Sequence, residues 1–127
     1  MGPILIVDDS SADRFLIKKA LLTQQSDLKL IELETGHDVV NVIKKNNPVA
    51  TLLDVRMPGI DGFDTLKMIR QEQGLEDHKV LMLSGSEEPS DIKIAQESGA
   101  NIFLTKPASF AEYTELAKSI NTIVFGI

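Results

Sequence analysis

Short apolar runs alternate with longer segments of helical periodicity along the chain, and this alternation constrains the fold more than any other feature. The apolar runs at 4–7, 28–33, 49–53, 80–83 and 102–104 have the length and composition of strands. Each is followed by a segment with apolar side chains at three- and four-residue spacing, as on one face of a helix. Such alternation is typical of a parallel sheet covered by helices on both faces, with right-handed crossovers. The sequence therefore predicts an α/β fold with five strand–helix units.

Capping residues and helix breakers mark the ends of the predicted helices. Ser10 and Asp13 have the spacing of a capping box at the start of the first helix. We expect that helix to bury Ala12, Leu16 and Ala20. The other boundary signals are Pro48 after the second helix, Gly74 after the third, Pro89 and Gly99 at the two ends of the fourth, and Ser109 with Glu112 before the fifth. The last helix is expected to bury a stripe made of Phe110, Tyr113, Ala117 and Ile120.

Composition narrows the class of protein. A chain of 127 residues is long enough to bury a core, and we expect one domain over residues 1–127. The net charge of −6 argues against binding to nucleic acid or to an anionic membrane. The apolar runs are too short to cross a bilayer, so a cytoplasmic location is predicted. The sequence contains no cysteine, and His37 and His78 lie far apart, which argues against thiolate chemistry and against a histidine metal site.

Polar residues that could bind a ligand or take part in a reaction follow four of the predicted strands. Asp8 and Asp9 follow the first strand, Asp54 the third, Ser84 the fourth, and Lys106 comes just after the fifth. In a parallel sheet these carboxyl ends lie at one edge, where open α/β sheets bind ligands. The sequence therefore predicts that three carboxylates, a hydroxyl and an ammonium group converge there.

Each of these residues also has a purely structural interpretation. One of Asp8 and Asp9 could satisfy the amides at the start of the first helix. Asp54 and Ser84 could be turn residues, and Lys106 could lie on the surface over apolar neighbours. These interpretations leave the clustering unexplained. Two carboxylates about 4 Å apart repel by roughly 4 kcal/mol at an effective dielectric near 20, so three of them need more positive charge than one lysine supplies.

A hard divalent cation would supply the missing charge. Magnesium binds carboxylate oxygens and shares its ligand shell with phosphate oxygens, so metal and lysine together indicate a ligand of phosphoryl size. A carboxylate directed at such a group can act as a nucleophile, which gives Asp54 a chemical role. Lys106 and the hydroxyl of Ser84 would then contact the transferred group.

Taken together, the motifs closely resemble those of the receiver domain of two-component response regulators. The resemblance extends through nearly the whole chain. The residues that carry it are Ile6-Val7-Asp8-Asp9-Ser10, Leu52-Leu53-Asp54-Val55-Arg56-Met57-Pro58-Gly59, Asp61-Gly62, Ser84-Gly85, Gly99-Ala100 and Lys106-Pro107. It implies a flavodoxin-like, doubly wound five-stranded parallel sheet in the order 2-1-3-4-5, flanked by five helices.

The resemblance also implies a role for each residue near the site. Asp54 resembles the phosphoacceptor, and Asp8, Asp9, Asp54 and the backbone carbonyl of Arg56 correspond to the ligands of Mg²⁺ (or Mn²⁺). Lys106 would contact the phosphoryl group, and the peptide bond between Lys106 and Pro107 is expected to be cis.

Two further positions correspond to the switch residues of the family. Ser84 stands at the position of the switch Thr or Ser, and Phe103 at that of the switch Tyr or Phe. Ser84 lacks the methyl group of threonine, so its rotamer is less restricted. Phe103, which is also expected in the core, lacks the hydroxyl of tyrosine. Arg56 and Ser86 occupy variable positions beside the site, and the resemblance implies that they tune the hydrolysis of the aspartyl phosphate.

The expected function is a phosphorylation switch rather than an enzyme acting on an external substrate. A histidine kinase or histidine phosphotransfer protein would phosphorylate Asp54, and the change would alter a partner-binding face formed by the fourth helix, the fifth strand and the fifth helix. The alternative is a pseudo-receiver, an interaction module that works without phosphorylation. A phosphohydrolase is disfavoured because Arg56 stands where a second acid is needed, and a flavin-binding domain because Asp8 and Asp9 would repel a phosphate.

Two segments outside the site leave questions open. The apolar residues 122–127 are expected to follow the last helix as a tail, which could pack on the sheet, join a homodimer or lead into a linker. Glu87, Glu88 and Asp91 near the fourth helix could influence the choice of partner, but the expected interpretation is a solvated acidic face.

Overall fold

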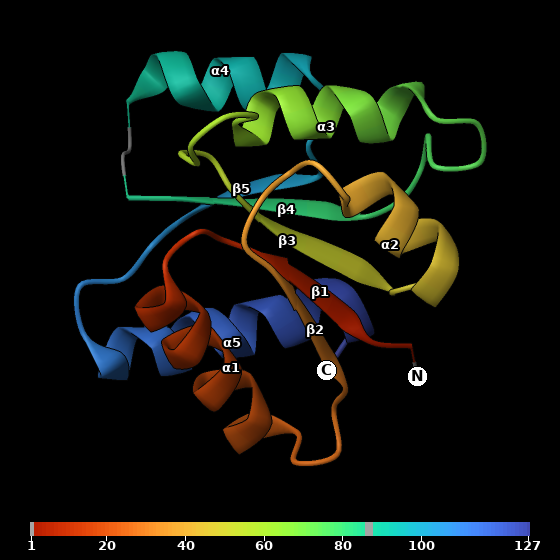
Figure 1. The fold of residues 1–127 in the computed structure, drawn as a ribbon. Coiled ribbons are helices and arrows are strands. Elements are labelled where there is room, and N and C mark those ends of the chain that lie inside the picture. The colour runs from red at the N-terminus through yellow and green to blue at the C-terminus, as the bar shows by residue number, and fades with distance from the viewer. Residues whose placement is uncertain (1, 86–87) are drawn as a thin grey trace.

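The computed structural model describes residues 2–85 and 88–127, and it confirms the predicted α/β fold (Figure 1). Five parallel strands form one sheet in the order β2-β1-β3-β4-β5. The elements in chain order are β1 (Ile4–Val7), α1 (Ser11–Gln24), β2 (Leu30–Leu33), α2 (Val39–Asn46), β3 (Ala50–Asp54), α3 (Gly62–Gln71), β4 (Val80–Ser84), α4 (Pro89–Glu97), β5 (Ile102–Thr105) and α5 (Phe110–Phe125).

The helices cover the two faces of the sheet unequally. Helices α1 and α5 lie together on one face, and α2, α3 and α4 lie on the other (Figure 1). The three central strands are buried along their full length, while β2 and β5 at the edges are only half-buried. Strands buried on both faces explain why their sequences are continuous apolar runs without alternation.

The strand register aligns the carboxyl ends. Val7 in β1 pairs with Leu53 in β3, and Asp54 pairs with Leu83 in β4. Asp8, the residue after Val7, therefore emerges next to Asp54. Ser84 pairs with Thr105 in β5, which brings the segment before Lys106 to the same edge. The predicted convergence of these segments is confirmed.

The last helix is longer than the sequence prediction. Helix α5 continues to Phe125, so the prediction that residues 122–127 form a tail after the helix is wrong. Ile123, Val124 and Phe125 continue the helical periodicity and pack against the core cluster between the sheet and α1. Gly126 then ends the helix with a φ of 74°, a left-handed conformation that glycine adopts without strain.

The buried faces of α1 and α5 also differ from the predicted stripes. Ala20 is buried as expected, but Ala12 is exposed and Leu16 is only half-buried. The buried residues of α1 are Arg14, Ile17, Ala20 and Leu21. In α5 the ring of Phe110 is exposed and lies 5.1 Å from the ammonium group of Lys19, while Tyr113, Ala117 and Ile120 are buried. The buried face of each helix is thus offset from the stripe that the sequence predicts.

Candidate functional site

Three carboxylates meet at the carboxyl edge of the sheet. Asp8 follows β1 and Asp54 is the last residue of β3, and these residues are 1% and 5% exposed. Asp9 is exposed to solvent beside them. One oxygen from each carboxylate lies within 4.8 Å of the others. Because such charges repel strongly when they are partly removed from water, the cluster has a high affinity for positive charge.

Lys106 provides positive charge from the segment after β5. Its ammonium nitrogen Nζ lies 2.8 Å from Oδ2 of Asp8 and 3.1 Å from Oδ1 of Asp54. It also donates a hydrogen bond of 2.8 Å to Oδ2 of Asp13, in the first turn of α1. From the sequence alone, Asp13 is predicted only as part of the helix cap. Asp13 lies in the first turn of the helix that begins shortly after Asp8 and Asp9, which is the signal that could have indicated its proximity to the site.

The surroundings shift the protonation equilibria of both groups. Burial raises the pKa of Asp54 to about 6, and the charges of Asp8 and Asp9 add to this effect, while Lys106 opposes it. Burial alone would lower the pKa of Lys106. Its hydrogen bond to Asp13 and the negative charges of Asp54 and Asp8 outweigh burial, so the pKa lies above its ordinary value. Lys106 therefore stays charged, and the site still carries excess negative charge.

The residues present fit a divalent metal ion. Asp8, Asp9 and Asp54 offer a compact set of hard oxygen ligands, which suits Mg²⁺ or Mn²⁺. Oδ1 of Asp8 accepts a hydrogen bond of 2.9 Å from the amide of Ser10, so the structural interpretation of Asp8 also holds in part. Its buried Oδ2 receives no hydrogen bond among the described residues and faces Lys106 only as an ion pair. A buried carboxylate oxygen of this kind is a ready metal ligand.

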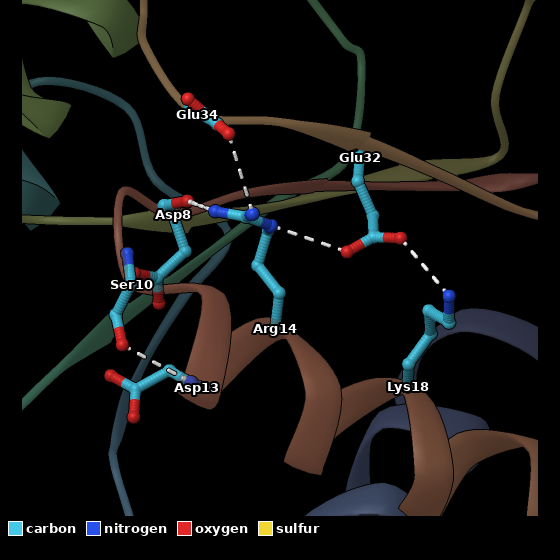
Figure 2. A network of polar contacts seen from close by, with 7 residues as sticks. All are labelled: Asp8, Ser10, Asp13, Arg14, Lys18, Glu32 and Glu34. Carbon is cyan, nitrogen blue, oxygen red and sulfur yellow. Dashed lines mark hydrogen bonds and ion pairs between the residues drawn. The ribbon is translucent and has the colours of Figure 1, made fainter.

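An arginine holds the backbone beneath Asp8. Figure 2 shows the guanidinium group of the buried Arg14 between Asp8 and two acids, Glu32 in the edge strand β2 and Glu34 just after it. Its Nη1 donates a hydrogen bond of 2.6 Å to the carbonyl oxygen of Asp8, and its Nε donates one of 3.2 Å to Glu32. Its Nη2 lies 3.7 Å from Glu34. The sequence does not indicate this role for Arg14, because an arginine in an amphipathic helix usually faces solvent.

Arg56 and Asp91 form an ion pair across the other flank of the site. Nη2 of Arg56 lies 3.0 Å and 2.8 Å from the two carboxylate oxygens of Asp91, on the first turn of α4. Asp91 is only 4% exposed, so its predicted place in a solvated acidic face is wrong. A buried carboxylate requires a charged partner, and Arg56 provides it. Glu88 is exposed, and Ser86 and Glu87 lie outside the described residues.

The two predicted switch residues lie on the last two strands. Ser84 is buried at the end of β4, and its carbonyl oxygen accepts a hydrogen bond of 2.7 Å from the amide of Lys106. Phe103 in β5 is half-buried, packs against the core and lines a cavity of about 230 Å³ beside α4. The peptide bond from Lys106 to Pro107 is trans, so the expected cis bond is wrong. The tertiary amide before proline favours trans by roughly 0.5–1 kcal/mol. From this conformer Lys106 reaches the carboxylates of Asp8, Asp13 and Asp54.

Comparison with known proteins agrees with this geometry. The family described as "Response regulator receiver domain" matches residues 4–118, so the chain belongs to that family. Protein PilH of Pseudomonas aeruginosa is 27% identical over 126 residues, which are 99% of this chain and all of PilH. Some other matched relatives are much longer, and this chain spans 15% of their length.

Solved structures of response regulators resemble the fold closely. The Mn²⁺-bound form of response regulator Rcp1 has a TM-score of 0.86 and 27% identity, and the match covers all of this chain and 97% of that one. The phosphorylated cyanobacterial phytochrome response regulator RcpA has a TM-score of 0.87 and 25% identity, with 97% of this chain and 93% of that one covered. The chain is thus a receiver domain of the two-component type, and a phosphorylation-independent module is disfavoured. Along the described residues, none of the helices has the length and apolar character needed to cross a membrane.

Proposed function

We propose that this chain is a phosphorylation switch in which Asp54 accepts a phosphoryl group, and that residues 1–127 act as one receiver domain. The observation that carries the proposal is the placement of Asp54. Its carboxylate is buried at the sheet edge, 3.1 Å from an ammonium group and close to the carboxylates of Asp8 and Asp9. A carboxylate so placed is positioned as a nucleophile beside a cation that can neutralise an incoming phosphoryl group.

Asp8, Asp9 and Asp54 would hold Mg²⁺ or Mn²⁺, together with the backbone carbonyl of Arg56. When bound, the metal ion supplies charge neutralisation and orientation for the phosphoryl oxygens. The similar response regulator Rcp1 has been solved in a Mn²⁺-bound form, which supports this assignment. The buried Oδ2 of Asp8, which receives no hydrogen bond among the described residues, independently supports the assignment of Asp8 as a metal ligand.

The proposed chemistry is transfer between two proteins. The donor is a histidine kinase or a histidine phosphotransfer protein. A carboxylate oxygen of Asp54 forms a bond to phosphorus while the bond from phosphorus to the donor's imidazole nitrogen breaks, and the electron pair returns to the imidazole. Lys106 contacts the transferred group. The chain acts only on its own phosphorylation and dephosphorylation and has no separate substrate.

The output would come from the face formed by α4, β5 and α5. The charge added at Asp54 attracts the hydroxyl of Ser84, and Phe103 repacks toward the space that this movement opens. The cavity beside Phe103 supports such a movement because it gives the ring adjacent free volume. A downstream protein, or a second copy of this chain in a homodimer, would read the altered face in the cytoplasm.

Intact mass spectrometry tests the proposal directly. The chain is incubated with magnesium and acetyl phosphate, beside an Asp54→Asn variant and a sample without metal. We expect one added phosphoryl group in the native chain, and none in the variant or without metal. An unmodified native chain that also fails to bind beryllofluoride, a phosphoryl mimic, would contradict the proposal and favour a phosphorylation-independent interaction module.

A further inference from the structure

Asp13 contacts the site through Lys106. The ammonium group of Lys106 has three N–H donors and faces three carboxylates, those of Asp8, Asp13 and Asp54. Asp8 and Asp54 belong to the compact oxygen cluster that fits a metal ion, and Asp13 is not part of that cluster. One of the three partners of Lys106 is therefore an acid with no place among the proposed metal ligands.

The position of Asp13 is fixed by its own helix. Its backbone amide donates a hydrogen bond of 3.2 Å to Oγ of Ser10, the N-cap of α1. Its side chain is 31% exposed, against 14% for Lys106, so the ion pair is partly shielded from water. The two residues are 93 positions apart in sequence, and their hydrogen bond ties the segment after β5 to the start of α1.

The three carboxylates respond differently to a divalent cation. A cation at the cluster neutralises much of the charge of Asp8 and Asp54, which weakens their attraction for Lys106. Asp13 keeps its full charge because it is not a ligand. It then becomes the strongest partner of Lys106 at the moment when a phosphoryl group needs the same ammonium group. Its negative charge also lies close enough to repel the arriving anion.

We propose that Asp13 is a positioning residue that holds Lys106 and, by its charge, lowers the affinity of the site for a phosphoryl group. The inference rests on the proposed function of Asp54. Asp13 anchors the ammonium group beside the site through its hydrogen bond, and its charge competes with the phosphoryl oxygens for that group. These two roles of Asp13 can be tested separately, because an asparagine at this position keeps an acceptor oxygen for Lys106 but carries no charge.

The test is the affinity for beryllofluoride at saturating Mg²⁺, measured for the native chain and for Asp13→Asn and Asp13→Ala. We expect Asp13→Asn to bind beryllofluoride about fivefold more tightly, the effect of losing one partly exposed ion pair. Asp13→Ala should gain less, because it loses the anchor as well. The affinity for Mg²⁺ alone should not rise in either variant, because removal of negative charge disfavours a cation.

Asp64→Asn is the matched control. Asp64 is also an acid in the first turn of a helix, α3, and its amide is also capped by the preceding N-cap residue, Asp61. It is exposed, and its side chain has no contact with the site among the described residues. A change of helix-end electrostatics alone would affect both variants alike, so beryllofluoride affinity should stay within about twofold of the native value in Asp64→Asn.

The outcomes separate this inference from the proposed function. Unchanged or weaker binding of beryllofluoride by Asp13→Asn, with normal binding by the native chain, would overturn the role of Asp13 and leave Asp54 as acceptor. Loss of Mg²⁺ and beryllofluoride affinity together would indicate structural damage and also overturn it. A native chain that binds no beryllofluoride in the presence of Mg²⁺ would overturn both.

Discussion

The two edges of the sheet both carry polar clusters, but the amino edge surrounds one arginine with neutral acceptors, whereas the carboxyl edge gathers like charges. At the amino edge, Arg70 of α3 donates hydrogen bonds to the backbone carbonyls of Gly99, Leu75 and His78, at 2.9, 3.2 and 2.7 Å. It donates another of 3.0 Å to Oδ1 of Asn101. The arginine thus joins the loops before β4 and β5, and each of its nitrogens has an acceptor.

At the carboxyl edge the charges face each other without balance. The ammonium group of Lys106 lies within 3.1 Å of the carboxylates of Asp8, Asp13 and Asp54, and Asp9 joins Asp8 and Asp54 in the oxygen cluster. Burial raises the pKa of Asp54 to about 6. Satisfied networks stabilise a fold, whereas unbalanced charge lowers stability until a ligand binds. The amino edge therefore contributes to stability, and the carboxyl edge is suited to binding.

Substitution of Arg70 by Met should have the largest effect on stability. It would leave several loop carbonyls without their donor, and we expect a loss of about 2–4 kcal/mol in the free energy of unfolding. Binding of Mg²⁺ and beryllofluoride by the folded variant should stay unchanged, since the contacts lie at the opposite edge. Chemical denaturation and ligand titration measure the two effects.

Lys67→Met is the control for Arg70→Met. Lys67 is exposed on the same helix, and its replacement should change stability by about 0.5 kcal/mol or less. Equal losses in the two variants would show that the hydrogen bonds of Arg70 contribute little. A large change in ligand affinity in Arg70→Met would break the distinction between the two edges.

Asp54→Asn should change stability less than Arg70→Met does, and it should stabilise the fold. Without metal at neutral pH, it removes a buried charge from an acidic cluster while Lys106 keeps Asp8 and Asp13 as partners. We expect a gain of about 1–2 kcal/mol in the free energy of unfolding. Excess Mg²⁺ should stabilise the native chain and have a much weaker effect on the variant.

Thermal and chemical unfolding with and without Mg²⁺ measure this prediction. Asp64→Asn again serves as the control, with little change expected in either condition. A variant less stable than the native chain would mean that the ion pair between Asp54 and Lys106 outweighs the repulsion among the carboxylates. The carboxyl edge would then be stabilised by its ion pairs, as the amino edge is stabilised by its hydrogen bonds.

The sequence predicted the sheet and the acidic cluster because both depend on local patterns. Apolar runs fix the strands, and parallel strands align their carboxyl ends, so Asp8, Asp54 and Lys106 had to meet. The partners of these residues were harder to predict. The ion pair between Arg56 and Asp91 and the contact of Asp13 with Lys106 depend on how side chains from separate elements extend across loops, for which the sequence carries no periodic signal.

Helix faces were predicted less well for a related reason. The spacing of Ala12, Leu16 and Ala20 indicates one face of α1, but the helix lies on the sheet with Ile17 and Leu21 inward and Arg14 beneath Asp8. Spacing by four residues shows which residues share a face, and tertiary packing decides which face is buried. The same packing extended α5 to Phe125, because the apolar residues there found core contacts.

His78 gives the smallest predicted effect, and it concerns pH. Burial lowers the pKa of His78 to about 4, with a further contribution from the charge of Arg70, and its Nε2 lies 2.8 Å from Oγ1 of Thr51. Between pH 6.5 and about 4 the unfolded chain binds a proton that the folded chain excludes. The contribution of His78 to stability is therefore complete above pH 6.5 and is lost as the pH falls through this window. Asp54 has the opposite sign, because its raised pKa makes the folded chain retain a proton that the unfolded chain releases.

Comparison of the native chain with His78→Gln isolates the contribution of the amino edge, since Asp54 titrates in both. Stability of the native chain relative to the variant should decline by about 1–2 kcal/mol from pH 7 to pH 4, less than the full pKa shift implies because the ring is only half-buried. Melting temperatures measured across this range would show it. Parallel curves for the two proteins would mean that the folded chain takes up a proton at His78 as readily as the unfolded chain does. The amino edge would then tolerate a second positive charge beside Arg70.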